Sequence, residues 1–121
     1  MTDSKKSKIT LLTQQDMPDN KTNEAKVVID FRSEKQLLIE KTVTMPEKSS
    51  VFDALSAAAP VITSRKFGMD HFVEAIAGIQ NDLASDRGWH FEVNGYRSNV
   101  PAERYLVKDG DFIKWLYLAA P

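Results

Sequence analysis

Two histidines and a few carboxylates are the residues of this 121-residue chain whose types could support chemistry. His90 and Glu92 stand two positions apart in an alternating segment, so their side chains would share one face of a strand, where His71 could approach them. Zinc sites normally draw at least three protein ligands from clustered positions. A histidine on the exposed face of a strand is usually solvated instead, so we expect no metal site here.

Asp109 and Asp111 flank Gly110, which gives the composition of a calcium loop without its pattern. An EF-hand needs further oxygen ligands and a glutamate at fixed spacing, whereas Asp and Gly are favoured in tight turns. The sequence also has no cysteine, no Gly-rich phosphate loop and no nucleophile elbow. We therefore expect a protein that is not an enzyme and that uses no cofactor.

The overall charge argues against two classes of partner. The chain has 16 Lys and Arg against 17 Asp and Glu, and its net charge is -1. Such a balance is untypical of nucleic-acid-binding or polybasic membrane surfaces. No apolar run approaches the roughly 18 residues of a membrane span, and the N-terminal residues lack a signal-peptide pattern. We expect no nucleic-acid partner, no membrane partner and a cytoplasmic protein.

The composition changes near position 23. Residues 1–23 are polar and predict a flexible N-terminal arm, because they cannot bury enough apolar surface to offset the entropy of ordering. The exception is a small cluster formed by Ile9, Leu11 and Leu12, which either docks on the domain or stays unstructured. Residues 24–121 predict a single domain, which is the usual organisation for a chain of this length.

The first elements of the domain follow from periodicity and capping. Alternating apolar residues predict a strand over residues 25–32, followed by a second strand that ends at Pro46. Lys41 interrupts the alternation, which predicts a bulge or a strand end there. Ser50 followed by Asp53 predicts a capped helix, and Pro60 stops the helical pattern.

The later elements are set by turn residues. We expect a loop over 64–68, a strand over 72–79 with a bulge or close contact at Gly78, and a polar loop over 81–86. Asn94-Gly95 predicts a tight hairpin, and Asp109-Gly110 predicts the turn before a final strand. The resulting order of strands and one helix predicts an α+β fold with the helix covering one sheet face. Its predicted core includes Phe31, Leu55, Ile76, Ile113 and Trp115.

A resemblance adds to this interpretation. The pattern Gly-Trp-x-Phe-x-Val-Asn-Gly at 88–95, and Tyr-x-Val-x-Asp-Gly-Asp-x-Ile-x-Trp-x-Tyr at 105–117, resembles the DUF4430 family, the transcobalamin-like C-terminal domain. Segments 46–55 and 73–78 also resemble this family, so the similarity extends over roughly residues 25–118. It implies a ubiquitin-like β-grasp fold, in which a mixed sheet of four to five strands carries one short helix on one face.

Two functional hypotheses follow. The resemblance implies a small-ligand-binding module with corrinoid contact, with Trp89, Tyr96 and Arg97 near the ligand. The competing interpretation places Trp89 in the core and Arg97 in solvent.

We favour an interaction module that uses the sheet face away from the helix, because alternation puts several apolar side chains there. They are Val28, Leu38, Phe112, Leu116 and Leu118. The expected partner is another protein, a second copy of the chain or the N-terminal arm. Individually exposed residues without a partner remain the alternative.

Overall fold

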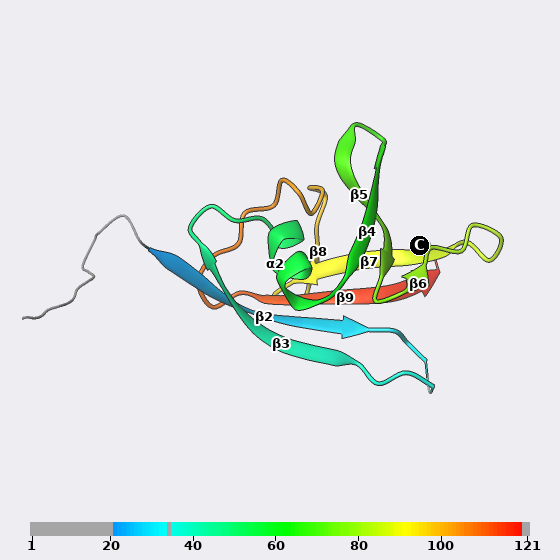
Figure 1. Cartoon of the computed structure of the whole chain (residues 1–121), viewed down its shortest axis with the longest axis horizontal. Helices are drawn as coiled ribbons and strands as arrows, with labels where there is room; N and C mark the ends of the chain where they lie inside the picture. Colours follow the sequence, from blue (N-terminus) through cyan, green and yellow to red (C-terminus); the bar gives the residue numbers. More distant parts are fainter. Residues whose placement is uncertain (1–20, 34, 120–121) are drawn as a thin grey trace, which may run out of the picture.

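The computed structural model describes residues 21–33 and 35–119, and the positions of the elements are shown in Figure 1. Most of the predicted arm, including the cluster of Ile9, Leu11 and Leu12, lies outside these described residues. Strand β2 begins at Thr22, slightly before the predicted boundary of the domain. Asn23 explains this difference, because it pairs with Met45 and its side-chain Nδ2 donates to the Val107 carbonyl at 3.0 Å.

The described residues form one helix and eight strands. In chain order they are β2 (Thr22–Asp30), β3 (Ile39–Pro46), α2 (Val51–Ala58), β4 (Val61–Lys66), β5 (Met69–Ile76), β6 (Ile79–Gln80), β7 (Arg87–Val93), β8 (Tyr96–Arg97) and β9 (Phe112–Ala119). Five strands make a sheet in the order β3-β2-β9-β7-β8. Strands β2 and β9 are parallel and the other neighbours are antiparallel, so the sheet is mixed, as predicted.

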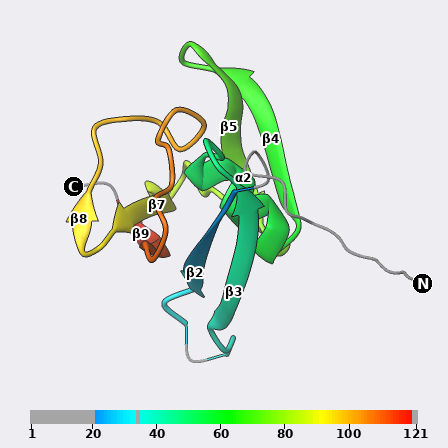
Figure 2. The ribbon, with the colours of Figure 1, turned by 90° about the vertical axis from the view of Figure 1, so that its left-hand side faces the viewer.

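The remaining strands form a second sheet in the order β4-β5-β6. Figures 1 and 2 show the β4–β5 hairpin rising from the side of the main sheet that α2 covers. The α+β class and, within the described residues, the one short helix are confirmed, but the second sheet was not predicted. The predicted strand over 72–79 does not join the main sheet, and its residues belong to this second sheet and the turn after it.

The loop predicted over 64–68 is wrong. Residues 61–66 form β4, and Phe67 and Gly68 make the tight turn into β5, with φ of 55° and 76°. Two-residue hairpin turns of type I′ need positive φ at both positions. The residues of β4 near this turn are polar and exposed, so they show none of the apolar alternation by which strands are recognised. Gly78 lies in a second tight turn with Ala77, where φ is 84° and 50°, and the turn joins β5 to β6.

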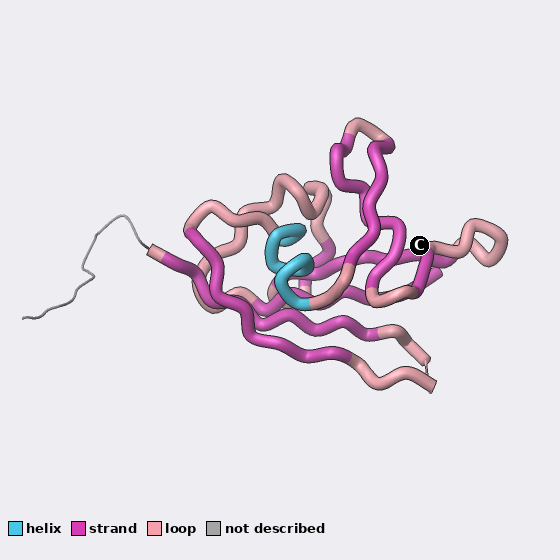
Figure 3. The backbone as a smooth tube through the Cα atoms, viewed as in Figure 1, coloured by secondary structure: helices cyan, strands magenta, loops and turns pink. Residues whose placement is uncertain are grey.

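The core lies between the main sheet and α2. The fully buried residues include Val27, Ile29, Leu55, Ile76 and Ile113, and Phe31 and Trp115 are almost fully buried, which confirms the predicted core. Burial of each large apolar side chain contributes about 1.5–3 kcal/mol relative to exposure. The short helix is therefore held by the sheet beneath it, as Figure 3 shows from the backbone.

The predicted capping box at the start of α2 is confirmed. The Ser50 hydroxyl accepts from the Asp53 backbone N–H at 3.1 Å, and Asp53 Oδ2 accepts from the Ser50 N–H at 2.8 Å. The prediction of a break at Lys41 is wrong, because β3 pairs with β2 in unbroken register through Val27 and Lys41. An edge strand lets the lysine side chain reach solvent without interrupting the pairing.

Both predicted turns of the C-terminal half are confirmed. Asn94 and Gly95 have φ of 53° and 89°, and Asn94 Oδ1 also accepts from the Phe112 N–H at 2.9 Å. Gly110 has φ of 87°, and Asp109 Oδ1 accepts from the Glu24 N–H at 2.8 Å. Asp111 Oδ2 accepts from the Lys108 N–H at 2.8 Å. The two aspartates therefore shape the turn and tie it to the first strand.

Candidate functional site

Side chains from β7, β9 and the segment after β6 join the second sheet to the main one. Asn81 donates through Nδ2 to the Val73 carbonyl at 3.0 Å, and its Oδ1 accepts from the Trp89 N–H at 3.0 Å. The Trp89 indole N–H donates to the Ile79 carbonyl at 2.9 Å, and the Tyr117 hydroxyl donates to the Gln80 carbonyl at 2.7 Å. These bonds fix the distance between β5 and β7.

The far end of the β4–β5 hairpin is held by the loop that precedes β9. The Glu103 carboxylate accepts from the backbone N–H groups of His71 at 2.6 Å and Asp70 at 3.2 Å. Burial raises the pKa of Glu103, but these two N–H groups, together with the positive charges of His71 and Arg104, leave that pKa below its ordinary value. Arg104 donates to the Gly68 carbonyl at 2.9 Å. The hairpin is thus tied at both ends.

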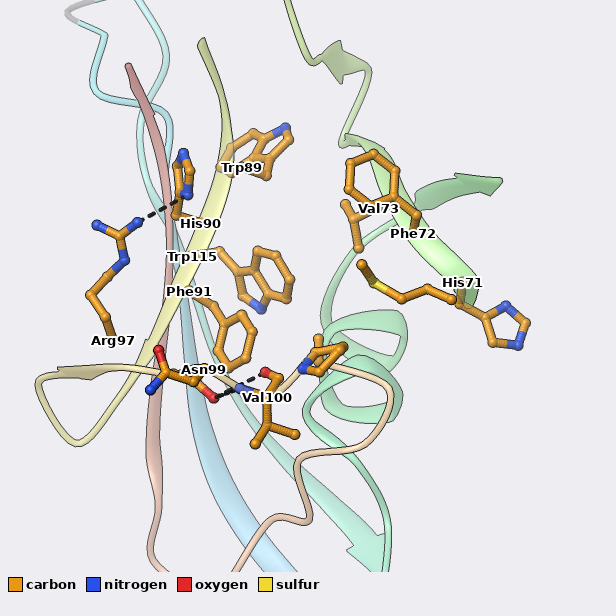
Figure 4. Close-up of a pocket in the computed structure, with 14 residues that line it drawn as sticks. His71, Phe72, Val73, Trp89, His90, Phe91, Arg97, Asn99, Val100 and Trp115 are labelled. Carbon is orange, nitrogen blue, oxygen red and sulfur yellow. Dashed lines mark hydrogen bonds between the residues drawn. The ribbon is translucent and has the colours of Figure 1, made fainter. Parts of the chain in front are cut away.

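A cleft runs between β7 and the β4–β5 hairpin. It consists of two adjoining cavities of about 300 Å³ and 700 Å³, and both are lined by Phe72, Trp89 and His90. The smaller cavity continues toward Phe91, Trp115 and the segment 98–102, and Figure 4 shows it in close-up. The larger is lined by Lys66, Phe67, Phe72, Glu74, Asn81, Leu83, Asp86, Arg87, Gly88, Trp89 and His90.

Aromatic rings form much of the lining. Phe67 contacts Phe72 edge-on at 5.2 Å, and Phe91 lies 5.1 Å from Trp115 between ring centroids. Phe67 and Leu83 are 79% and 89% exposed, so the larger cavity has apolar side chains at its open edge. Clefts with mainly apolar walls and a few polar groups are typical small-molecule sites.

Two of the charged groups that line the larger cavity, Lys66 and Glu74, are paired with each other. Glu74 accepts from the Ser64 hydroxyl at 2.5 Å and lies 2.9 Å from the Lys66 ammonium. These two contacts, the hydroxyl first, hold the pKa of Glu74 below its ordinary value. The Lys66 ammonium also stands 5.9 Å from the Phe72 ring centroid. The pairing leaves the aromatic wall, rather than a net charge, as the main feature of this cavity.

His90 and Arg97 meet on the opposite side of β7. Arg97 Nη2 lies 3.2 Å from His90 Nδ1, and Figure 4 shows this pair on the other side of the strand from Phe72. Burial, and secondarily the positive charge of Arg97, lowers the pKa of His90. Since a guanidinium only donates, His90 accepts through Nδ1 and is neutral in this arrangement.

The three residues proposed for corrinoid contact are brought together only in part. Trp89 and Arg97 both line the smaller cavity, where Trp89 is half-buried and the Arg97 guanidinium is directed to His90. Tyr96 lines neither cavity and is 78% exposed on the β7–β8 hairpin.

The five residues of the predicted interaction face are spread over one side of the main sheet and differ in exposure. Val28 and Leu116 are each 6% exposed, and Leu118 is half-buried. Phe112 is 40% exposed at the start of β9, and Leu38 is 54% exposed just before β3. Lys26 and Glu40 form an ion pair on the same side. This face is therefore mixed in polarity rather than one apolar patch.

The histidines are far from forming a joint site. His71 stacks on Phe52 of α2 at 4.8 Å, while His90 faces the other side of β7. Within residues 21–33 and 35–119, no three His, Asp or Glu side chains gather as metal ligands would. Within the described residues, no helix is long and apolar enough to cross a membrane.

Sequence reasoning missed the residues that build the cleft, above all Phe67, Asn81, Leu83 and Glu103. Phe67-Gly68 is a turn signal between two strands, and it could have identified the hairpin. Asn81 and Glu103 act through backbone groups of distant residues, so no local pattern marks them.

Comparison with known proteins shows which family the chain matches. Its residues 48–119, more than half of the chain, match the family described as "Domain of unknown function (DUF4430)". No curated protein sequence matches the chain. A solved structure of haptocorrin in complex with Cbi is similar in fold, with a TM-score of 0.65 and 11% identity over 88% of this chain. The chain spans 27% of the length of that haptocorrin chain.

A second structure is also similar. It is a provisionally assigned metal-binding protein from Ruminococcus gnavus ATCC 29149, with a TM-score of 0.60 and 14% identity over 82% of this chain and 99% of that chain. At these identities the similarity concerns the fold alone, and it agrees with a transcobalamin-like domain. The family match carries the assignment, and this chain belongs to the DUF4430 family.

Proposed function

We propose that this protein is a binding module without catalytic activity, and that it holds a small, largely apolar molecule in the cleft between β7 and the β4–β5 hairpin. The observation that carries the proposal is the continuity of the two cavities through Phe72 and Trp89. Their volumes lie within the range of about 300–1,000 Å³ that small-molecule sites occupy.

The attachment of the hairpin also supports binding. Asn81 and Glu103 hold β5 at two separate points, so the cleft exists before a ligand arrives. A preformed site loses less conformational entropy on binding than one that must be assembled. The exposed Phe67 and Leu83 would lose their contact with water when a ligand occupies the larger cavity.

The absence of catalysis is part of the proposal. Figure 4 shows the rings of His71 and His90 directed away from the centre of the smaller cavity. Glu74 at the larger cavity is engaged by Ser64 and Lys66. A general acid or base must reach the substrate proton, so this arrangement favours binding over proton transfer.

The similarity to haptocorrin in complex with Cbi supports a ligand-binding role in general terms. Cobalamin is one ligand to test, because the family resemblance implies corrinoid contact. Tyr96 lines neither cavity and the Arg97 guanidinium is engaged with His90, which argues that such contact would use a partly different set of residues from the predicted one.

The order of the strands supports a β-grasp fold for this module. A hairpin of β2 and β3 precedes α2, and the last strand β9 lies in the middle of the sheet, parallel to the first. We infer that the three-stranded sheet over residues 61–80 is an addition to this arrangement, and that it exists to form the second wall of the cleft.

The experiment uses the fluorescent apolar probe 1-anilinonaphthalene-8-sulfonate with the full chain. Leu83→Ser should weaken probe binding about fivefold, by the loss of an apolar contact of about 1 kcal/mol. Leu37→Ser is the matched control, because Leu37 is equally exposed, at 89%, and lies outside the cleft. Equal probe affinity in the two variants would refute a binding site in the cleft.

A second candidate function is protein interaction through the other face of the main sheet. Its support is the exposure of Phe112 and Leu38 on that side. Phe112→Glu should reduce self-association in sedimentation experiments if the partner is a second copy, whereas Leu37→Glu should leave it unchanged. Leu116 is a poorer test position, since it is 6% exposed and its replacement would disturb folding. If the unchanged chain, Phe112→Glu and Leu37→Glu all sediment as monomers, the homodimer is ruled out.

A further inference from the structure

Strand β7 has an incompletely paired side, because its outer neighbour β8 pairs with only its last two residues. In an antiparallel sheet the backbone groups of alternate residues point to the same side of a strand. The residues of β7 that point away from β9 are Arg87, Trp89, Phe91 and Val93, the last of which pairs with β8. An unpaired strand edge offers its N–H and C=O groups to any strand that can pair with it.

The chain itself covers both ends of this side of β7. At one end, Arg87 exchanges two backbone bonds with Asp82, at 2.9 Å and 3.0 Å, and the Trp89 N–H donates to Asn81 Oδ1 at 3.0 Å. At the other end lies β8. Between them, the Trp89 carbonyl and the Phe91 N–H have no partner among the described residues. These two groups, one acceptor and one donor, are called the open edge below.

Strand β8 ends before the open edge because the chain turns at Ser98. The Ser98 hydroxyl donates to the Val100 carbonyl at 2.9 Å and accepts from the Val100 N–H at 2.8 Å. Such local bonds compete with the pairing of a strand. The position next to the open edge is therefore left to another partner.

The smaller cavity reaches the open edge. Figure 4 shows Trp89 and Phe91 on the side of β7 that faces β5, and His90 and Arg97 on the other side. All four residues line the cavity, so it passes over the strand edge between the two sides. Trp89, His90 and Phe91 are only half-buried, so this stretch of β7 is open to solvent.

From this arrangement we propose that the cleft binds a short peptide in an extended conformation, which adds to β7 at the open edge. The inference rests on the proposed function, since it specifies the ligand of the same cleft. If the peptide runs parallel to β7, one of its residues donates to the Trp89 carbonyl and accepts from the Phe91 N–H. If it runs antiparallel, the residues on either side of that one do so. Main-chain bonds provide the affinity when a peptide adds to a sheet edge.

The surroundings of the open edge select the side chains of the peptide. Paired residues of neighbouring strands share a face, so peptide residues opposite Trp89 and Phe91 would lie among the aromatic walls, near Phe72. The residue between them would lie on the side of His90 and Arg97. The Arg97 guanidinium has five N–H donors, and no carboxylate among the described residues forms an ion pair with it. The site therefore suits an acidic residue between two apolar ones.

The test compares two capped peptides in titrations of the full chain. One is N-acetyl-leucyl-glutamyl-leucine N-methylamide, and the other is the same peptide with a methyl group on every amide nitrogen. The methylated peptide keeps the side chains and the carbonyl oxygens but cannot donate to the Trp89 carbonyl. The unmethylated peptide should bind at least about fivefold more tightly, the factor that one net hydrogen bond provides. Equal affinity of the two peptides would overturn the inference.

Hydrogen exchange in the unchanged chain locates the peptide. The Phe91 N–H, which has no acceptor, should exchange fast in the free protein and several-fold more slowly when the unmethylated peptide is bound. The Trp89 N–H, which already has Asn81 as acceptor, is the internal control. Slow exchange at Phe91 before any peptide is added would mean that the chain itself or a second copy occupies the open edge, and would overturn the inference. Peptide binding without slower exchange at Phe91 would also overturn it.

A pair of variants tests the place of the acidic side chain. Arg97→Ala should weaken binding of the glutamyl peptide by up to about fivefold, the range of an exposed ion pair. Arg104→Ala is the control, since Arg104 lines neither cavity. Equal peptide affinity in the two variants would overturn the assignment of the acidic residue to Arg97. Failure of both peptides, with the anilinonaphthalene probe still bound in the cleft, would overturn the inference and leave the proposed function intact. Failure of the peptides and of this probe would refute the proposed function itself.

Discussion

The side-chain oxygen of Asn81 lies so close to Gly88 that a Cβ atom at position 88 would be 2.9 Å from it. The approach arises because Asn81 reaches across to the Trp89 N–H while also binding the Val73 carbonyl. Gly88 is thus required by the side chain that joins the two sheets, and its backbone conformation sets no such requirement.

Replacement of Gly88 by alanine should therefore destabilise the protein by about 1–3 kcal/mol, the usual cost of forcing extra atoms into a packed site. In the Asn81→Ala background the same change should be neutral or stabilising by up to about 1 kcal/mol, since the obstructing oxygen is gone and alanine restricts the unfolded chain. Urea denaturation of the unchanged chain, the two single variants and the double variant measures these free energies of unfolding. An equal cost of Gly88→Ala in both backgrounds would show that Asn81 is not the obstacle.

Asn81→Ala alone should cost about 1–3 kcal/mol, because it leaves the Val73 carbonyl and the Trp89 N–H without their side-chain partner. It should also weaken binding of the anilinonaphthalene probe, since β5 is no longer held at its distance from β7. Thr42→Ala is the control, because Thr42 is an exposed polar residue on β3 and lines neither cavity. If Asn81→Ala lowers the stability but leaves the probe affinity unchanged, the Asn81 contacts between the two sheets do not control the shape of the cleft.

The lowered pKa of His90 predicts a loss of stability toward acid. Its pKa in the unfolded chain is about 6.5, so below that pH the unfolded state takes up a proton that the folded state does not bind. The free energy of unfolding should therefore be fully present above pH 6.5 and should fall between that pH and the lower folded pKa. His90→Gln should flatten this part of the profile. A profile of unchanged slope in the variant would assign the acid sensitivity to other groups.

Arg97 makes a separate contribution to the same group. Arg97→Ala should raise the pKa of His90 toward its ordinary value without reaching it, because burial is the larger cause of the depression. The titration of the His90 ring protons by proton spectroscopy measures this directly. Arg104→Ala is the control, since Arg104 binds the Gly68 carbonyl and does not contact His90. No change in the pKa of His90 without Arg97 would contradict the observed contact.

Glu103 should control the mobility of the β4–β5 hairpin. Glu103→Ala removes the acceptor of the His71 and Asp70 N–H groups, so exchange of these two amide hydrogens should be several-fold faster. Glu103→Gln keeps one carbonyl oxygen and should give an intermediate rate. Exposed Glu47 replaced by alanine should leave both rates unchanged. Unchanged exchange in Glu103→Ala would mean that the hairpin is held by other contacts.

The elements with local signals were predictable from the sequence. Ser50 and Asp53 cap the helix through bonds within one turn, and Asn94-Gly95 and Asp109-Gly110 adopt the backbone that their residue types favour. The second sheet was missed because β4 lacks the alternation of apolar and polar residues that marks a strand. The cleft depends on where that sheet stands, which is decided by contacts over long sequence separations such as Glu103 with His71. Conversely, alternation correctly placed Val28 and Leu116 away from the helix, but exposure depends on neighbouring strands, and both are buried.

The most direct test of the account is a map of backbone amide shifts of the full, nitrogen-15-labelled chain on addition of 1-anilinonaphthalene-8-sulfonate. The account predicts the largest shifts at Phe72, Leu83 and Trp89, which line the cleft. It predicts small shifts at Val28, Phe112 and Leu116 on the opposite face of the main sheet. The largest shifts on that opposite face, or no shifts at all, would contradict the assignment of the cleft as the binding site.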